Sequence, residues 1–153
     1  MPEKKMLELV SFKVGESLFV LPIQYIQEII RLTAVVAIPK SPDFMEGVIN
    51  LRGKVIPVID LRKRFGIEGT IQGSQGRIII TEVEDFMVGL QVDSVSEVVK
   101  ANADELEKTP SFITGIDHNF VEGIIKHGDT MFILLTIDNI LTSSETEILK
   151  DVK

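Results

Sequence analysis

Short apolar stretches, separated by residues that favour turns, follow one another along most of the chain. Val10, Phe12 and Val14 alternate with polar residues, and the turn pair Gly15-Glu16 follows them. Alternation with a period of two is the pattern of a half-buried β-strand. The stretches predict hairpins formed by 10–14 with 18–21, by 48–49 with 55–59, and by 77–81 with 86–92, and a further strand at 131–135 after Gly128-Asp129.

Helical signals are fewer and shorter than strand signals. Pro22 fits the first turn of a helix that would carry Glu28, with its apolar face formed by Ile23, Ile26 and Ile30. Asp60 is in position to cap a brief helix that ends at Gly66. Two segments resemble capping boxes, in which a polar residue is followed by Glu three positions later. They are Asn102 with Glu105 and Ser144 with Glu147.

The sequence contains an internal repeat. Residues 44–65 align without gaps on residues 120–141, and residues 19–30 align on residues 88–99. Matched apolar residues are common in strands, so the matched polar and glycine positions carry more weight. These positions are Glu28 with Glu97 and the pair Glu46-Gly47 with Glu122-Gly123.

The repeat predicts how the chain is organised. We interpret residues 1–153 as a single domain made of two β units, at about 15–66 and 77–141, between which strands could be exchanged. The Gly-rich segment 67–76 would join the units. Each unit alone is marginal in size, so we expect the two to pack on each other. Many short strands with few helices favour small barrels or a sandwich.

Composition and charge exclude several classes of function. The 153 residues are 44% hydrophobic, carry a formal charge of −7 and include no cysteine. The acidic balance argues against nucleic-acid binding, and the lack of cysteine excludes disulfides and thiolate metal sites. Charges interrupt each candidate membrane-spanning run, and the N-terminus has no apolar stretch of signal-peptide length. We therefore expect a cytoplasmic protein without direct membrane insertion.

No pattern predicts a catalytic, cofactor or metal site. The segment from Gly47 to Lys54 has five residues between its glycines, where a phosphate-binding loop needs four, and Val55 replaces the Ser or Thr that ligates magnesium. His118 and His127 are the only histidines, and both lie in turn-like sequence. Exposed polar residues are the ordinary expectation in turns.

Two charged residues have both a structural and a functional interpretation. Arg52 precedes a glycine at the predicted tip of a hairpin, and Glu28 lies on the predicted short helix, whose other face is apolar. Each could be an ordinary solvated side chain. Together they could instead belong to a docking surface, because rigid scaffolds place recognition residues on turns and at the ends of elements. A docking protein would also expose contiguous aliphatic side chains.

Three segments together resemble the CheW family of chemotaxis coupling proteins. They are VGESLFVLPIQYIQEII, IPKSPDFMEGVINLRGKVIPVIDLRKRFG and VGLQVDSVSEVVK. The most specific part is Glu-Gly-Val-Ile-Asn-Leu-Arg-Gly at 46–53 followed by Pro57-Val-Ile-Asp-Leu61. The resemblance runs from about residue 7 to residue 141, and no receiver or kinase segment accompanies it.

The resemblance implies a mostly β fold of two SH3-like five-stranded barrels packed together, with a few short helices. It also implies a non-enzymatic cytoplasmic adaptor, recruited to membrane chemoreceptor clusters. Its partners would be the cytoplasmic tips of methyl-accepting chemoreceptors and the regulatory domain of the chemotaxis histidine kinase. By the same resemblance, Ile26, Glu28 and Arg52 match receptor-binding positions, and the glycines with roles in turns or close packing are Gly47, Gly53, Gly89 and Gly123. The residues that contact the kinase cannot be assigned from these motifs.

A rival hypothesis is a small β-barrel that binds a ligand or an oligonucleotide. The charge of −7 argues against it, as does the scarcity of stacking aromatics, since Tyr25 is the only Tyr or Trp. An enzyme is a third hypothesis, and the absence of a recognisable active-site motif makes it the weakest.

Overall fold

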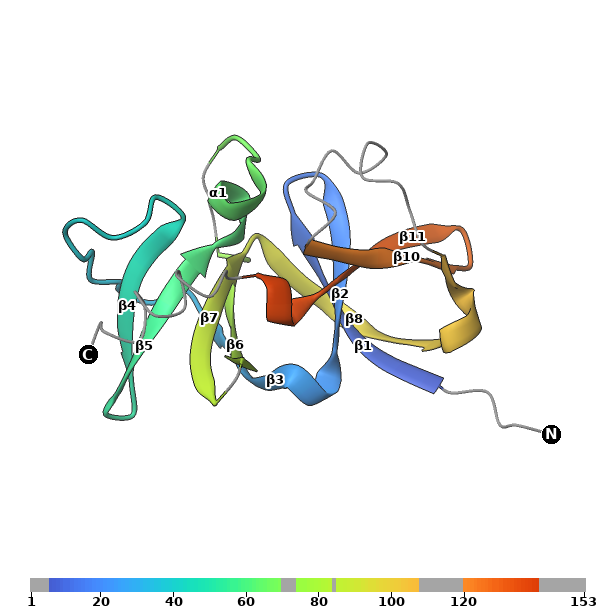
Figure 1. The fold of residues 1–153 in the computed structure, drawn as a ribbon, viewed down its shortest axis with the longest axis horizontal. Helices are drawn as coiled ribbons and strands as arrows, with labels where there is room; N and C mark the ends of the chain where they lie inside the picture. Colours follow the sequence, from blue (N-terminus) through green and yellow to red (C-terminus); the bar gives the residue numbers. More distant parts are fainter. Residues whose placement is uncertain (1–5, 70–73, 84, 108–119, 141–153) are drawn as a thin grey trace.

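The computed structural model describes residues 6–69, 74–83, 85–107 and 120–140. Strands dominate these ranges, with one short α-helix and three described 3-10 turns between them (Figure 1). The strands are β1 (Met6–Val14), β2 (Ser17–Pro22), β3 (Ile26–Arg31), β4 (Met45–Leu51), β5 (Lys54–Asp60), β6 (Arg77–Val83), β7 (Phe86–Val92), β8 (Ser94–Asn102), β9 (Leu106–Glu107), β10 (Val121–His127) and β11 (Thr130–Leu135). The helix is α1 (Leu61–Phe65), and the 3-10 turns are η1 (Ile23–Tyr25), η2 (Ala103–Glu105) and η4 (Ile137–Asn139).

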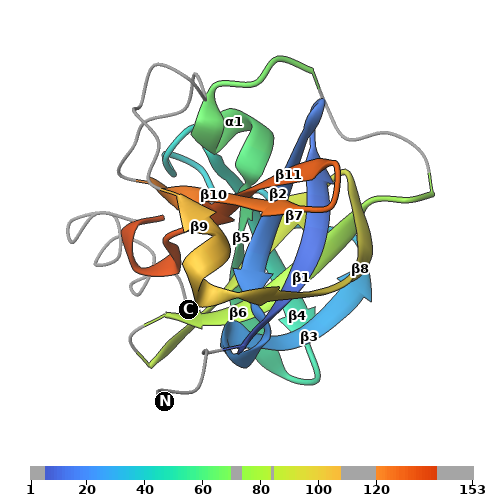
Figure 2. The same ribbon diagram turned by 90° about the vertical axis from the view of Figure 1, so that its right-hand side faces the viewer.

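The strands form two sheets. One has the order β3-β6-β7-β5-β4, and we call it the central barrel. The other has the order β8-β1-β2-β11-β10-β9, and we call it the terminal barrel. The central barrel lies on the left of Figure 1 and the terminal barrel on the right, and Figure 2 looks onto the terminal barrel. The mostly β architecture of two SH3-like barrels is therefore confirmed.

The two barrels have the same strand order once equivalent strands are matched. Pairing β1 with β6, β2 with β7, β3 with β8, β4 with β10 and β5 with β11 converts the order of the central barrel into β8-β1-β2-β11-β10, and β9 is an additional edge strand of the terminal barrel. The single parallel contact also corresponds, because β5 runs parallel to β7 and β11 runs parallel to β2. Each barrel takes strands from both halves of the sequence. The subdomain boundaries at 15–66 and 77–141 stay a prediction.

Among the described residues, buried apolar side chains form three clusters, and the largest lies between the two barrels. Each barrel has a cluster drawn from its own strands, such as Leu9 and Ile125 in the terminal barrel and Ile56 and Ile78 in the central one. The third cluster combines residues of both barrels, and we call it the shared core. It contains Phe12, Val14, Phe19, Leu21, Phe44, Met45, Ile59, Leu61, Phe65, Ile79, Val83, Val88, Leu90, Val92, Leu135, Ile137 and Ile140. Because residues of both barrels form this core, neither barrel has a complete core of its own.

A row of aromatic rings crosses the shared core. Phe65 of α1 stacks on Phe19 of β2 with a centroid distance of 5.3 Å, and its ring lies 5.7 Å from the tilted ring of Phe120. The guanidinium of Arg64 lies over the rings of Phe44 and Phe120, at 4.3 and 4.9 Å. These two phenylalanines occupy matching positions in the repeat. Helix α1 therefore joins the equivalent starts of β4 and β10 through cation–π contacts.

Several predicted turns and caps are confirmed. The hairpin turns at Gly15-Glu16, Arg52-Gly53 and Gly128-Asp129 join paired antiparallel strands. Asp60 caps α1 by accepting a hydrogen bond from the backbone N–H of Arg62 at 2.9 Å, and Gly66 ends the helix with a φ of +73°. The capping box of Asn102 with Glu105 forms at η2, whereas Ser144 and Glu147 lie outside the described residues, as do residues 70–73 of the predicted linker.

The helix predicted from Pro22 is wrong. The chain makes the single turn η1 and then continues as strand β3, so Ile26 and Glu28 lie on a strand. In the antiparallel register of this strand with β6, Ile29 faces Ile79 and Ile30 faces Ile78. β-Branched side chains lose rotamer freedom in a helix and pack well on a pleated sheet. The pairing with an equally Ile-rich strand therefore overrides the helical spacing of the isoleucines.

The matched Glu-Gly pairs of the repeat are β-bulges. The register of β4 against β5 shifts at Glu46-Gly47, and that of β10 against β11 shifts at Glu122-Gly123. In both places another backbone segment crosses close to the glycine. A Cβ on Gly47 would lie 2.2 Å from the carbonyl oxygen of Val36, and one on Gly123 would lie 2.5 Å from that of Glu107. The matched glycines of the repeat therefore reflect the same requirement in both barrels, a bulge at which another backbone segment passes close by.

Membrane crossing by a helix is not a feature of the described ranges. No helix there combines the length and the apolar character that a bilayer requires.

Candidate functional site

The structure brings together two of the three residues that sequence reasoning selected. Arg52 lies in the turn between β4 and β5, and its guanidinium reaches the carboxylate of Glu28 on β3. One hydrogen bond, from Nη1 to Oε1, measures 2.9 Å, and a second joins Nη2 to Oε2. Two parallel bonds form the bidentate geometry that arginine makes with a carboxylate.

The turn holds Arg52 in a defined position. Arg52 and Gly53 have positive φ values of +50° and +86°, and Gly53 donates its N–H to the side-chain oxygen of Asn50 at 2.8 Å. Positive φ at both central residues is the requirement of a two-residue type I′ hairpin, in which glycine at the second position is common. The local sequence Asn-Leu-Arg-Gly therefore specifies where the arginine points.

Ile26 has a different environment. A bulge in β3 lies between Ile26 and Glu28, and the side chain of Ile26 packs against the shared core, where it is partly buried. It therefore contributes to the position of β3. Gly89 lies in the interior of the central barrel, where a Cβ would meet Ile78 at 2.7 Å.

The pair is exposed and electrostatically coupled. The side chain of Arg52 is 71% exposed and that of Glu28 is 29% exposed. The hydrogen bond from Arg52 lowers the pKa of Glu28 below its ordinary value, and the reciprocal bond raises the pKa of Arg52. Both groups therefore stay charged throughout the neutral range. Exposed ion pairs contribute little to stability, so the fold itself gains little from this one.

The second barrel serves as an internal control. Strands β3 and β4 are the two edges of the central barrel, and the ion pair links one edge to the hairpin that ends the other. The terminal barrel has the same strand order, with Glu97 at the position of Glu28 and Gly128 at the position of Arg52. It forms its hairpin without an arginine. The fold therefore does not need the pair, which makes the pair a candidate for function.

Exposed aliphatic side chains accompany the pair. Eight large apolar residues are exposed among the described residues, and five of them lie between η1 and the start of β5, namely Ile23, Ile29, Leu32, Val36 and Val55. Two of these have exposed equivalents in the terminal barrel, because Ile29 corresponds to Val98 and Val55 to Met131. Exposure at those two positions follows from the barrel architecture. The remaining three extend the apolar surface along η1 and the segment after β3.

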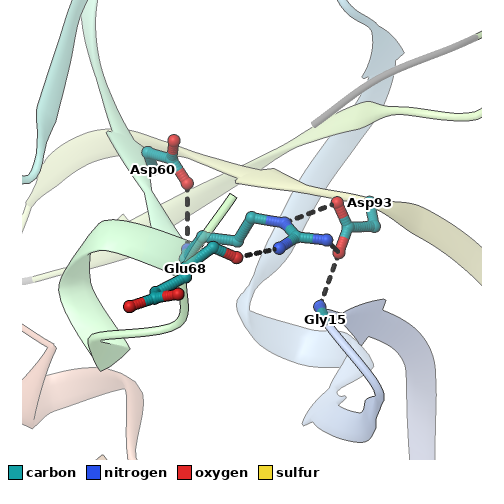
Figure 3. Close-up of polar contacts among 5 residues, drawn as sticks. Gly15, Asp60, Glu68 and Asp93 are labelled. Carbon is teal, nitrogen blue, oxygen red and sulfur yellow. Dashed lines mark hydrogen bonds and ion pairs between the residues drawn. The ribbon is translucent and has the colours of Figure 1, made fainter. Parts of the chain in front are cut away.

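A second polar cluster, centred on Arg62, was not anticipated from the sequence (Figure 3). Arg62 of α1 forms an ion pair with Asp93 at 2.9 Å and donates to the carbonyl oxygen of Glu68 at 2.6 Å. Asp93, between β7 and β8, also accepts the backbone N–H of Gly15 from the β1–β2 turn at 2.5 Å. The cluster thus ties elements of both barrels. Gly15, Arg62 and Asp93 are far apart in sequence, so only the folded chain reveals that they meet.

We expect Arg62→Met to destabilise the protein by about 2 kcal/mol, because both charges are largely buried and Asp93 would lose its partner. Lys63→Met is the matched control on the same helix, since the ion pair of Lys63 with Glu46 is much more exposed. Its loss should cost less than about 1 kcal/mol. Urea titrations of both variants provide the measurement. Equal effects would show that the Arg62 cluster does not join the barrels energetically.

Metal binding has no evident site in the described part of the chain. No group of three or more His, Cys, Asp or Glu side chains there could hold a metal ion. His127 lies exposed at the end of β10, and His118 lies outside the described residues.

Comparison with known proteins decides the family. Residues 8–145 match the CheW-like domain. The chain belongs to the CheW family. The chemotaxis protein CheW of Treponema pallidum is 33% identical over 144 residues, which cover 92% of this chain and 85% of that protein. The CheW protein of Klebsiella aerogenes is 32% identical over 145 residues, covering 95% and 87%.

A solved structure agrees with this assignment. The crystal structure of the scaffolding protein TtCheW from Thermoanaerobacter tengcongensis superposes with a TM-score of 0.85 at 39% identity, covering 95% of this chain and 92% of that one. As a CheW-family chain, the protein is a chemotaxis coupling adaptor. The ligand- or oligonucleotide-binding barrel is not favoured by these comparisons.

Proposed function

We propose that the chain couples chemoreceptors to the chemotaxis histidine kinase without catalysing a reaction. One surface would bind the cytoplasmic tip of a methyl-accepting receptor, and another would bind the regulatory domain of the kinase. The chain would act in the cytoplasm, at membrane receptor clusters. Its CheW-family membership supports a role in chemotaxis signalling in general.

The observation that carries the receptor contact is the Glu28–Arg52 pair. It lies at the open edge of the central barrel, stays charged at neutral pH and has no counterpart in the terminal barrel. A receptor tip is a bundle of helices. When the face of a helix docks on an apolar surface, charged side chains beside that surface fix the register of the helix. Neighbouring aliphatic side chains such as Ile23 and Leu32 supply the apolar part of such a contact. Ile26 would support the contact by fixing β3 on the shared core.

We expect Arg52→Ala to weaken binding of a receptor cytoplasmic fragment by about 1–3 kcal/mol, as truncation of an interface arginine does. Arg52→Glu should weaken it further, because Glu28 would then face a like charge. Titration calorimetry against the receptor fragment and against the kinase regulatory domain separates the two contacts. The kinase affinity should change little.

Lys54→Ala is the matched control. Lys54 is an exposed cation beside the same turn, and the substitution removes the same charge as Arg52→Ala does. Circular dichroism would verify the fold of each variant. Unchanged receptor binding by Arg52→Ala would refute this site. An equal loss for both partners would indicate a shared surface or a general loss of stability.

A further inference from the structure

A pair of arginines faces each other across β3 and β6. Arg31, the last residue of β3, is the direct partner of Arg77, the first residue of β6, in the antiparallel register. Like charges in directly opposite positions destabilise a sheet. The chain as a whole is acidic, with a net charge of −7, so an uncompensated positive pair is unexpected on general grounds.

The terminal barrel again shows the ordinary structural solution. The equivalent of the β3–β6 pairing is the β8–β1 pairing, and there Lys100 faces Glu8. Opposite charges thus occupy the positions that Arg31 and Arg77 occupy in the central barrel. The same fold is built with a complementary pair, so the two arginines are not a requirement of the barrel.

The arginines border an open hollow. Arg31, Leu32, Ser74, Gly76 and Arg77 line a space of about 430 Å³. The Nη1 atom of Arg77 donates to the carbonyl oxygens of Ser74 and Gly76 at 2.9 and 2.7 Å, which fixes its guanidinium. Within the described residues, no partner is recorded for the other donors of Arg77 or for Arg31. One guanidinium is therefore held in place and the other is exposed beside it.

We propose that Arg31 and Arg77 form a binding site for a carboxylate group of a protein partner. Two guanidinium groups on one hollow offer several N–H donors, which suit the planar oxygens of a carboxylate. The site lies on an edge strand, three residues from Glu28, which is about 10 Å along an extended chain. A free anion has the same chemistry. The site lies on the same edge of the sheet as the proposed receptor contact, and this position favours a carboxylate of a protein over a free anion. Only this preference for a protein rests on the proposed function.

The test is an NMR titration of the arginine Nε–Hε signals with a hexaglutamate peptide and, separately, with inorganic phosphate. The signals of Arg31 and Arg77 should shift saturably with the peptide, at lower concentration than with phosphate. Arg31→Glu should lower the affinity for the peptide by about 10-fold or more, because the substitution removes charge-assisted hydrogen bonds. It should also leave the melting temperature unchanged or raise it by about 1–3 °C, because the cross-strand pair becomes complementary.

Lys100→Glu changes the net charge by the same amount at the equivalent position of the terminal barrel and should leave peptide binding intact. Arg52→Ala should also leave it intact, so failure of the receptor contact and failure of this site are distinguishable. The proposal is overturned if the peptide causes no saturable shift, or if Lys100→Glu weakens the peptide as much as Arg31→Glu does. A fall in melting temperature of Arg31→Glu would assign the pair a structural role, and tighter binding of phosphate would indicate a free anion.

Discussion

Replacing Phe65 by alanine is expected to lower the free energy of unfolding by about 3–5 kcal/mol, the usual range for emptying a buried aromatic site. Phe65 is 8% exposed, stacks on Phe19 and also contacts the ring of Phe120. These contacts join α1, which follows β5 of the central barrel, to β2 and the start of β10 of the terminal barrel. Because the shared core is the largest cluster of the described chain, the loss should be felt by both barrels at once.

Native-state hydrogen exchange measures this directly. Protection of amides in β2 and in β7 should fall by the same free energy in the variant, because the two barrels unfold as one cooperative unit. Phe65→Leu keeps most of the apolar volume and should cost only about 1 kcal/mol. A decrease confined to one barrel would show that the barrels are separate folding units.

Replacing Gly47 by alanine is expected to cost about 2–4 kcal/mol, for two independent reasons. The residue has a φ of +149°, a conformation that side chains with a Cβ rarely adopt. Its Cβ would also lie 2.2 Å from the carbonyl oxygen of Val36, which accepts a hydrogen bond from Val48. The β4 backbone or the crossing segment would have to move, and that hydrogen bond would be weakened.

Gly53→Ala separates the two causes. Gly53 also has positive φ, but no atom lies within 4 Å of the Cβ that would be added. Only backbone strain of about 1 kcal/mol is expected there. Urea unfolding of the two variants gives the comparison. If the two substitutions cost the same, the close approach at Gly47 contributes nothing.

Because the chain builds two barrels with matching strand order, each barrel can be compared with the other. Features that recur in both, such as the bulges at Glu46-Gly47 and Glu122-Gly123, are requirements of the fold. Features present in one barrel only are free to serve another purpose. The Glu28–Arg52 pair and the facing pair of Arg31 with Arg77 belong to this second group. This distinction needs no other sequence, because the same topology is built twice.

Local sequence signals predicted most of the elements. Hairpins around Arg52-Gly53 and Gly128-Asp129 were predictable because turn chemistry is a property of neighbouring residues. The cap of α1 by Asp60 was predictable for the same reason. Strand β3 was not, because the spacing of Ile23, Ile26 and Ile30 fits a helix as well as a strand. Pairing with β6, a distant segment, decided between the two.

The sequence by itself determined most of the strands, the turns, the internal repeat and the family, since each depends on residues close together or on a pattern along the chain. It also selected Glu28 and Arg52, but not the bond between them. Only the tertiary structure decided that these two side chains meet, that Arg62 joins Asp93, and that Arg31 faces Arg77. Those contacts depend on which strands pair and in which register. Strand order and register are set by burying the shared core of both barrels at once, which is a property of the whole chain.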